Sequence, residues 1–461
     1  MTDIFSWLQL IASNVWLFGG TFILVLSLLV FVHEWGHYIV ARLCGVRVEV
    51  FSIGFGKEIC GYTDSHGTRW KLSLIPLGGY VKMFGDTDPA SAGHKDKVEE
   101  GGITRPLTPE ERNVAFFAKP VGQRSAIVFA GPAINFLFAI MLLSGLFAVY
   151  GQPVTPPMAS SVIVGSAADV AGFKPHDKIL SVNGKDIVKF EQVRREVAIA
   201  LDTPMTFVVL RGGEEITLNA TPKKEIITDR FGFEHSKGLL GIMGPGSGFA
   251  LEGIKAVNGQ KTQNADQARR LIVARLGRDM TIDLAKSDGT FDRLNIKPMA
   301  EANAGMKSPA DELYGTLIVA EKQGDDVVKW GLFGSIKAAL RETYDVTTST
   351  LTAMGQIVTG TRSATELGGI IRIGAIAGDM ATLGVAALIS FTALLSINLG
   401  LINLFPIPML DGGHLVFYGI EAVRGKPLSE MMQEYAFRFG LVVLVVIMVF
   451  ANLNDILQLV L

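Results

Sequence analysis

The N-terminal part of this chain has no charged residue from Ile4 to Val32, and this run leads directly into an HExxH motif from His33 to His37. A helix of about 20 apolar residues spans a hydrocarbon core about 30 Å thick. In that core every backbone polar group needs an internal partner, which restricts such a segment to a helix. The sequence therefore predicts a transmembrane helix over residues 12–40 that carries histidine and glutamate side chains.

The spacing of these polar residues suits a metal site. His33 and His37 are four residues apart, so on a helix both imidazoles project from one face and can bind one zinc ion. Glu34 follows the first histidine directly, where its carboxylate can act as general base toward water instead of binding the metal. A chance match is the alternative, but the chain has only seven histidines and ionisable groups at membrane depth are costly without a function. We therefore predict a hydrolytic zinc site inside the bilayer.

Composition limits the class of protein. Hydrophobic residues make up 49% of the chain and mean hydropathy is +0.36, which indicates an integral membrane protein with polar parts. Net charge is -2 and no basic stretch combines with aromatic residues, so we expect no nucleic-acid binding. Cys44 and Cys60 lack the spacing of a metal site or a disulfide framework. The N-terminus lacks the basic start of a cleavable signal peptide, so we expect the first span to be retained.

Three further apolar runs predict transmembrane helices, at 125–150, 381–410 and 439–454. Lys and Arg are frequent between the first two spans and absent from the N-terminal tail. The positive-inside rule then makes that loop cytoplasmic. Both termini and the segment from about 151 to 380 should be extracytoplasmic, and the metal should lie near the cytoplasmic face.

An internal repeat occupies residues 159–300. Val182-Asn183-Gly184 recurs 75 residues later as Val257-Asn258-Gly259, and each copy ends in two alternating runs around a turn, which predicts β-hairpins. The first copy resembles a bacterial PDZ domain. The second has only a Gly-rich stretch, Gly244–Gly253, where the first helix should be. Peptide binding by strand addition and a purely steric role are both compatible with these modules.

A zinc hydrolase needs a third protein ligand. Asp411 is the best candidate, because it closes a long apolar run and follows Pro406 and Pro408, which break regular helix. An interfacial aspartate at a helix end is the alternative. His414 is a rival ligand, although we expect it to be an interfacial helix residue.

Together, these features resemble the site-2 protease family. The resemblance rests on the HExxH motif, the Asn403–Gly412 segment, the PDZ-like modules and four spans. Further local matches are Phe51–Gly56, Trp70–Met83 and Gly131–Phe136. The chain departs from the family in its eroded second PDZ copy and at residues 368–371, where Gly-Gly-Ile-Ile replaces the frequent Gly-Pro-Ile.

The resemblance implies specific site residues. His33, His37 and Asp411 would bind Zn²⁺, Glu34 would be the base, and Asn403 would contact the substrate backbone. A helix-packing hydrogen bond is the alternative role for Asn403. In the family, residues such as 46–83 form membrane-associated β-hairpins, whose free edge can pair with an unwound substrate.

We therefore expect a multi-span α-helical membrane protein with four transmembrane helices, a membrane-associated β-hairpin region and two extracytoplasmic PDZ-like α+β modules. The expected divisions are helix 1 with HExxH at 1–45, a cytoplasmic-side hairpin loop at 46–120, helix 2 at 121–150, PDZ-like modules at 159–225 and 226–300, a linker with amphipathic helices at 301–380, helix 3 with the third ligand at 381–420, and helix 4 at 430–461. The polar loop 85–112 is expected to be a solvated linker.

By resemblance, the function is that of an intramembrane zinc metalloprotease in a bacterial inner membrane. Its partners would be the lipid bilayer and single-span membrane proteins, and the expected reaction is the second cut of an anti-sigma factor in an envelope stress response. The PDZ pair would exclude untrimmed substrates by size, and we expect a monomer. A PDZ scaffold with a vestigial metal site is one alternative, although Glu34 argues against it. A metal transporter is another, but it should place ionisable groups along several spans, and the second and fourth predicted spans have none.

Overall fold

The computed structural model describes residues 2–85, 97–100, 103–229, 231–246, 248–286, 289–319 and 327–460. Within these residues, four helices are long and apolar enough to cross a membrane. They are α1 (Thr2–Leu43), α3 (Val121–Val149), α9 (Val385–Asn403) and α11 (Glu430–Val460). Helix α3 packs against both α1 and α9. Four helices able to span a membrane thus lie near the four predicted apolar runs.

The third predicted run is not one continuous helix. Helix α9 ends at Asn403, and a new helix, α10 (Asp411–Arg424), begins only after an irregular segment. Pro406 and Pro408 lie in that segment, where each removes a backbone donor and neither can continue a helix. The break lets the chain turn inside the apolar run, so that Asp411 begins a helix.

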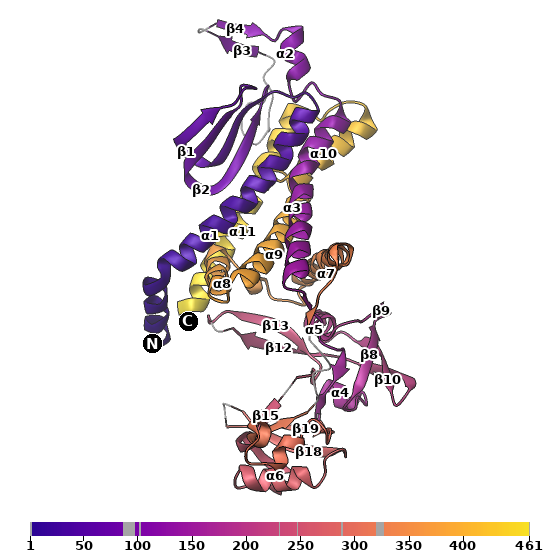
Figure 1. Cartoon of the computed structure of the whole chain (residues 1–461). Helices are drawn as coiled ribbons and strands as arrows, with labels where there is room; N and C mark the ends of the chain where they lie inside the picture. The colour runs from indigo at the N-terminus through magenta and orange to yellow at the C-terminus, as the bar shows by residue number, and fades with distance from the viewer. Residues whose placement is uncertain are drawn as a thin grey trace.

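A curved β-sheet packs against α1 at the end of the helix bundle that lies away from both termini (Figure 1). It forms from β1 (Val48–Thr63) and β2 (Arg69–Met83), the predicted hairpin region. The first half of β1 pairs with both ends of β2, so residues 79–83 form an edge of the sheet. Phe51 is buried and stacks on Trp70 with ring centroids 4.3 Å apart.

The loop predicted as a linker contains ordered structure. A short hairpin, β3 (Lys97–Glu100) with β4 (Ile103–Pro106), precedes α2 (Pro109–Val114). Thr108 and Glu111 form a capping box at α2, and Arg105 pairs with Glu111 at 2.8 Å. These local contacts explain why a polar sequence adopts structure here. Residues 86–96 and 101–102 of the predicted linker lie outside the described residues.

Two β-rich modules lie at the opposite end of the bundle (Figure 1). Their shared sequence has a shared structural role: Asn183 and Asn258 both adopt positive φ, +50° and +49°. Each side chain accepts a hydrogen bond from the backbone N–H of a later threonine, Thr206 at 2.9 Å and Thr281 at 2.8 Å. The internal repeat is therefore a structural repeat.

The first module contains a sheet in the order β11-β10-β8-β6, with β9 on β8, and the second a sheet in the order β14-β7-β19-β18-β16-β17. The elements of the first are β6 (Met158–Ala159), α4 (Ala167–Val170), β8 (Asp177–Val182), β9 (Lys185–Asp186), α5 (Phe190–Ile199), β10 (Met205–Arg211) and β11 (Glu214–Ala220). Those of the second are β7 (Ser161–Ile163), β14 (Ile242–Met243), β16 (Ile254–Val257), β17 (Gln260–Lys261), α6 (Ala265–Val273), β18 (Met280–Ala285) and β19 (Phe291–Ile296). Strand β7 precedes most of the first module in sequence but pairs with β19 and β14, so a cut at residue 226 does not separate the two sheets.

Within the segment 301–380, where amphipathic helices were expected, lies the helix α7 (Leu332–Thr359). It packs on α3 and meets α5 of the first module through charged side chains. Glu342 pairs with Lys189 at 2.9 Å and also with Arg195, which lies 3.5 Å from Asp345. Burial raises the pKa of the Glu342 carboxyl, but the two cations outweigh it and hold that pKa below its usual value.

Helix α11 is attached to the bundle near its last turns. Asp455 is fully buried, and its Oδ2 accepts hydrogen bonds from the backbone N–H groups of Gly369 and Arg372 at 2.9 and 3.0 Å. These are backbone donors at the N-terminal end of α8 (Ile370–Thr382), so a side chain of α11 caps this shorter helix. The remaining elements are β5 (Gln152–Pro153), β12 (Lys223–Thr228), β13 (Glu234–Leu239), β15 (Gly248–Ala250), β20 (Thr316–Ile318), β21 (Val327–Val328) and the 3-10 turns η1 (Leu251–Gly253), η2 (Ala304–Lys307), η3 (Glu312–Gly315) and η4 (Ala364–Glu366).

Candidate metal centre

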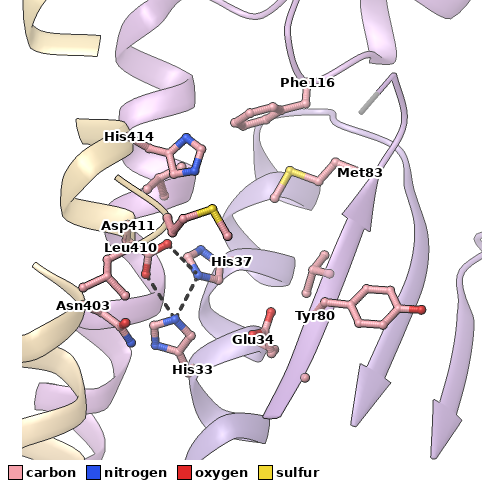
Figure 2. Close-up of a pocket in the computed structure, with 14 residues that line it drawn as sticks. His33, Glu34, His37, Tyr80, Met83, Phe116, Asn403, Leu410, Asp411 and His414 are labelled. Atoms are coloured by element: carbon pink, nitrogen blue, oxygen red, sulfur yellow. Dashed lines mark hydrogen bonds and ion pairs between the residues drawn. The ribbon is translucent and has the colours of Figure 1, made fainter. Parts of the chain in front are cut away.

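The structure brings three predicted ligands together from α1 and α10. His33 Nε2 lies 3.2 Å from His37 Nε2 and 3.1 Å from Asp411 Oδ2, and His37 Nε2 lies 3.6 Å from Asp411 Oδ1 (Figure 2). Ligand atoms about 2.0–2.2 Å from a tetrahedral zinc ion are separated by roughly 3.3 Å. The three observed separations match that value, so the group has the dimensions of a zinc site with one open position.

The outer nitrogens of both imidazoles have protein partners. His37 Nδ1 donates to the backbone oxygen of Ile127 at 2.9 Å, and the Asn135 side chain lies 3.1 Å from His33 Nδ1. The amide nitrogen of Asn135 is the atom placed beside Nδ1, and its Oδ1 has no partner in the described part of the chain. With Nε2 directed at a metal, His33 would carry its proton on Nδ1, and the Asn135 amide would then turn so that its oxygen accepts that proton. Asp411 Oδ2 is buried without a hydrogen bond from any described residue. A cation between the three groups would satisfy Oδ2 of Asp411 together with the Nε2 atoms of both histidines.

Close contact between α1 and α3 holds the two histidines in place. A Cβ added to Gly36 would lie 2.5 Å from the backbone oxygen of Ala130. A Cβ added to Gly131 would lie 2.9 Å from Cε1 of His33, and it would be closer still to Nε2 of His37. Such distances are shorter than real side-chain contacts. Glycine at these two positions is therefore a steric requirement of the metal group.

The segment before α10 directs Asp411 toward the histidines. Met409 has φ of +87°, a conformation that non-glycine residues rarely adopt, and this turn precedes the first residue of α10. A Cβ on Gly412 or Gly413 would clash with backbone carbonyls of residues 404–407. The two glycines thus allow α10 to begin directly against the irregular segment.

Glu34 lies beside the group of three but is not part of it. Its carboxylate accepts a hydrogen bond from the backbone of Val81 in β2, and a Cβ on Gly79 would lie 3.2 Å from its Cγ. Glu34 is therefore held between the metal group and the edge of the sheet, as Figure 2 shows. That is where a base acting on water at the metal would lie.

A cavity of about 200 Å³ opens at this centre. Its lining includes all five predicted site residues: His33, Glu34, His37, Asn403 and Asp411. Asn403 is the last residue of α9, so the end of that helix places its amide beside the metal group. The edge of β2 lines the same cavity through Gly79, Tyr80, Val81 and Met83.

His414 lies on a helix, as expected, and faces the cavity. It is 8% exposed and lines the cavity, one turn after Asp411, so it is buried within the protein at the candidate centre. It does not belong to the group of three that could hold a metal, so the rival-ligand alternative is not supported among the described residues. Sequence reasoning also gave no role to Asn135, although an asparagine within an uncharged span is the kind of signal that could have indicated one.

Known proteins resemble this chain over nearly its whole length. Residues 21–447 match the sequence model of Peptidase family M50. A protein of Agrobacterium fabrum whose name places it among zinc metalloproteases is 41% identical over 435 residues, 94% of each chain. The regulator of sigma-E protease RseP of Escherichia coli is 33% identical over 456 residues, 95% of this chain and 97% of its own. The regulator of sigma E protease of Haemophilus influenzae is 33% identical over 469 residues, 95% of this chain and 98% of its own.

Proposed function

Because this chain belongs to peptidase family M50 and is a zinc metalloprotease of the site-2 protease family, we propose that it cuts single-span membrane proteins inside the inner membrane. One observation carries the proposal: His33, His37 and Asp411 converge to 3.1–3.6 Å with Glu34 beside them, and both histidines and Glu34 lie on a helix long enough to cross a membrane. A hydrolytic centre placed in this way meets peptide bonds of membrane-embedded chains.

We assign the metal to His33, His37 and Asp411 and the role of base to Glu34. Zinc bound there supplies a Lewis acid that polarises the scissile carbonyl and makes water more acidic. Glu34 takes the proton of the attacking water on its carboxylate and hands it to the nitrogen of the leaving amine. The carboxylate is suited to both transfers because the Val81 backbone fixes it next to the cavity.

A transmembrane substrate must unwind before attack, since helical carbonyls are hydrogen-bonded within their own helix. Residues 79–83 offer an edge strand in the cavity wall to which an unwound segment can add. Backbone hydrogen bonds to this edge would replace those that the substrate loses. We assign Asn403 a contact with the substrate backbone, because its side chain lines the same cavity.

We further propose that the two modules are PDZ-like and extracytoplasmic. The repeated Asn-Gly turn supports a common module type, and the basic loop between α1 and α3 favours the cytoplasmic side for the β1–β2 sheet. Both termini lie toward the end of the bundle that bears the modules (Figure 1). In this arrangement the modules lie on the outer side of the membrane-spanning helices, where they exclude substrates with large outer domains.

The biological setting that we propose is the second cut of a membrane-bound anti-sigma factor, with the enzyme acting as a monomer. The names of the Escherichia coli and Haemophilus influenzae relatives support this setting, since both are regulators of sigma-E. A prior cut on the outer side would supply a trimmed substrate small enough to pass the modules.

The test is cleavage of a reporter with one transmembrane span by the reconstituted full-length protein. Glu34→Gln should keep zinc and lower the cleavage rate by roughly 10²–10⁴-fold, because the base is lost while the three ligands remain. Glu49→Gln removes a carboxylate that pairs with Lys82 on the β1–β2 sheet at 2.8 Å and should leave the rate nearly unchanged. Undiminished cleavage by Glu34→Gln would refute the base, and the absence of cleavage by the wild type would refute the proposed substrate class.

A further inference from the structure

The cavity at the metal group has two different walls. One wall is the edge of β2, with Gly79, Tyr80 and Val81. The other is built from the end of α9, the irregular segment and the start of α10. A substrate strand paired with β2 turns one of its two hydrogen-bonding edges toward this second wall.

The carbonyls on that second edge need donors. Away from water, an unpaired backbone polar group costs enough to oppose binding of an extended segment. Outside the metal group, the described residues of the second wall that can donate from a side chain are Asn403 and His414. In Figure 2 these two residues lie on opposite sides of the group formed by His33, His37 and Asp411.

His414 is held in a fixed orientation. Its ring lies 5.1 Å from that of Phe437 in α11 and 6.5 Å from that of Phe417 in α10. Helix α10 is itself fixed to α3, because Arg124 pairs with Glu421 at 2.6 Å. A buried imidazole with this packing is a pre-organised polar group in the second wall of the cavity.

We propose that His414 is a further substrate-binding residue of the catalytic centre. Its imidazole N–H donates a hydrogen bond to a substrate carbonyl on the edge that faces away from β2, on the side of the metal group opposite Asn403. Asn403 and His414 then bind one edge of the unwound substrate segment, while β2 pairs with its other edge. This inference rests on the proposed function, since it requires an extended substrate in the cavity.

Three variants separate hydrogen bonding from packing. His414→Phe keeps a ring against Phe437 but removes the donor, so cleavage should fall about tenfold or more while zinc content stays at one per chain. His414→Gln restores an N–H donor and should recover most of the rate. Phe417→Leu changes the same aromatic cluster without lining the cavity, and it should leave kcat and KM within about threefold of wild type.

A backbone substitution in the substrate gives the decisive readout. The probe is a synthetic single-span peptide in lipid vesicles, in which amides near the cut are replaced one at a time by esters, whose carbonyls are weaker acceptors. One ester position should slow the wild type about tenfold and slow His414→Phe much less, because the variant no longer uses that carbonyl.

Different outcomes reject different statements. Cleavage by His414→Phe at the wild-type rate, loss of zinc from it, or equal ester effects in both proteins would overturn the role of His414 alone. If His414→Phe does not fold, a rate for His414→Gln no better than that of His414→Ala would do the same. Absence of Glu34-dependent cleavage by the wild type would overturn the proposed function and this inference with it.

Discussion

The metal centre and the contact between the first module and α7 are held by different kinds of interaction. At the centre, α1 and α3 approach so closely that Gly36 and Gly131 cannot carry a side chain. Between α5 and α7 the contact is made by Lys189 and Arg195 with Glu342, whose side chains retain some exposure. Close packing has a single solution, whereas contacts between long charged side chains can form in more than one geometry. The difference indicates a rigid candidate metal centre and a more adjustable contact between the first module and α7.

The largest loss of zinc and activity should come from a substitution at the close contact between α1 and α3. Gly131→Ala places a methyl group against both histidines, so we expect loss of bound zinc and at least a hundredfold loss of cleavage. Metal analysis and the single-span reporter measure both. Gly145→Ala on the same helix meets nothing within 4 Å and serves as the matched control. Full zinc occupancy in Gly131→Ala would show that the helix contact is looser than the structure indicates.

A smaller effect is expected from the support of His33. Asn135→Ala removes the group that orients its imidazole, and outer partners of metal ligands typically contribute 10–100-fold in metal affinity or activity. Competition with a zinc chelator reports the affinity directly. Thr392→Ala removes a hydroxyl that donates to the backbone oxygen of Leu388 within α9, and it should leave zinc affinity unchanged. An unaltered affinity in Asn135→Ala would remove Asn135 from the account of the metal site.

The smallest effect is expected at the contact between α5 and α7, and it depends on pH. The pKa of Glu342 lies below its usual value of 4.5, so its ion pairs contribute fully above that pH and are lost as pH falls through the lowered pKa. Hydrogen exchange of α5 should therefore accelerate on acidification, and Glu342→Gln should show the faster exchange at neutral pH as well. Glu196→Gln, also in α5, removes a more exposed ion pair with Lys185 and should change the hydrogen exchange of this helix little. Identical exchange in Glu342→Gln and wild type would mean that apolar packing, not charge, holds this contact.

Local sequence signals predicted the parts of the site that local geometry controls. His33, Glu34 and His37 share one helix, and Asp411 stands where an apolar run is broken by prolines, so each could be identified without a fold. Asn135 and Gly131 act on α1 from α3, and only the packing of the two helices shows their roles. The burial of His414 depends on Phe437 of α11, which is also a tertiary contact.

The same distinction applies to the fold. Hydropathy predicted four spans because the bilayer imposes length and polarity on each one separately. Strand β7 could not be assigned in this way, since its three residues pair with strands that follow more than 75 residues later in the chain. The contacts within the β3–β4 hairpin and the capped helix α2 are local in sequence, like those of the spans. Their polar composition nevertheless predicted a linker in place of these elements.

The central statement is that one zinc ion is bound by His33, His37 and Asp411, and X-ray absorption at the zinc edge of the purified full-length protein tests it most directly. We expect two imidazole nitrogens and carboxylate or water oxygens at about 2.0–2.2 Å, with the carboxylate contribution lost in Asp411→Asn. A sulfur ligand at about 2.3 Å, or a spectrum that is unchanged in Asp411→Asn, would contradict the assignment.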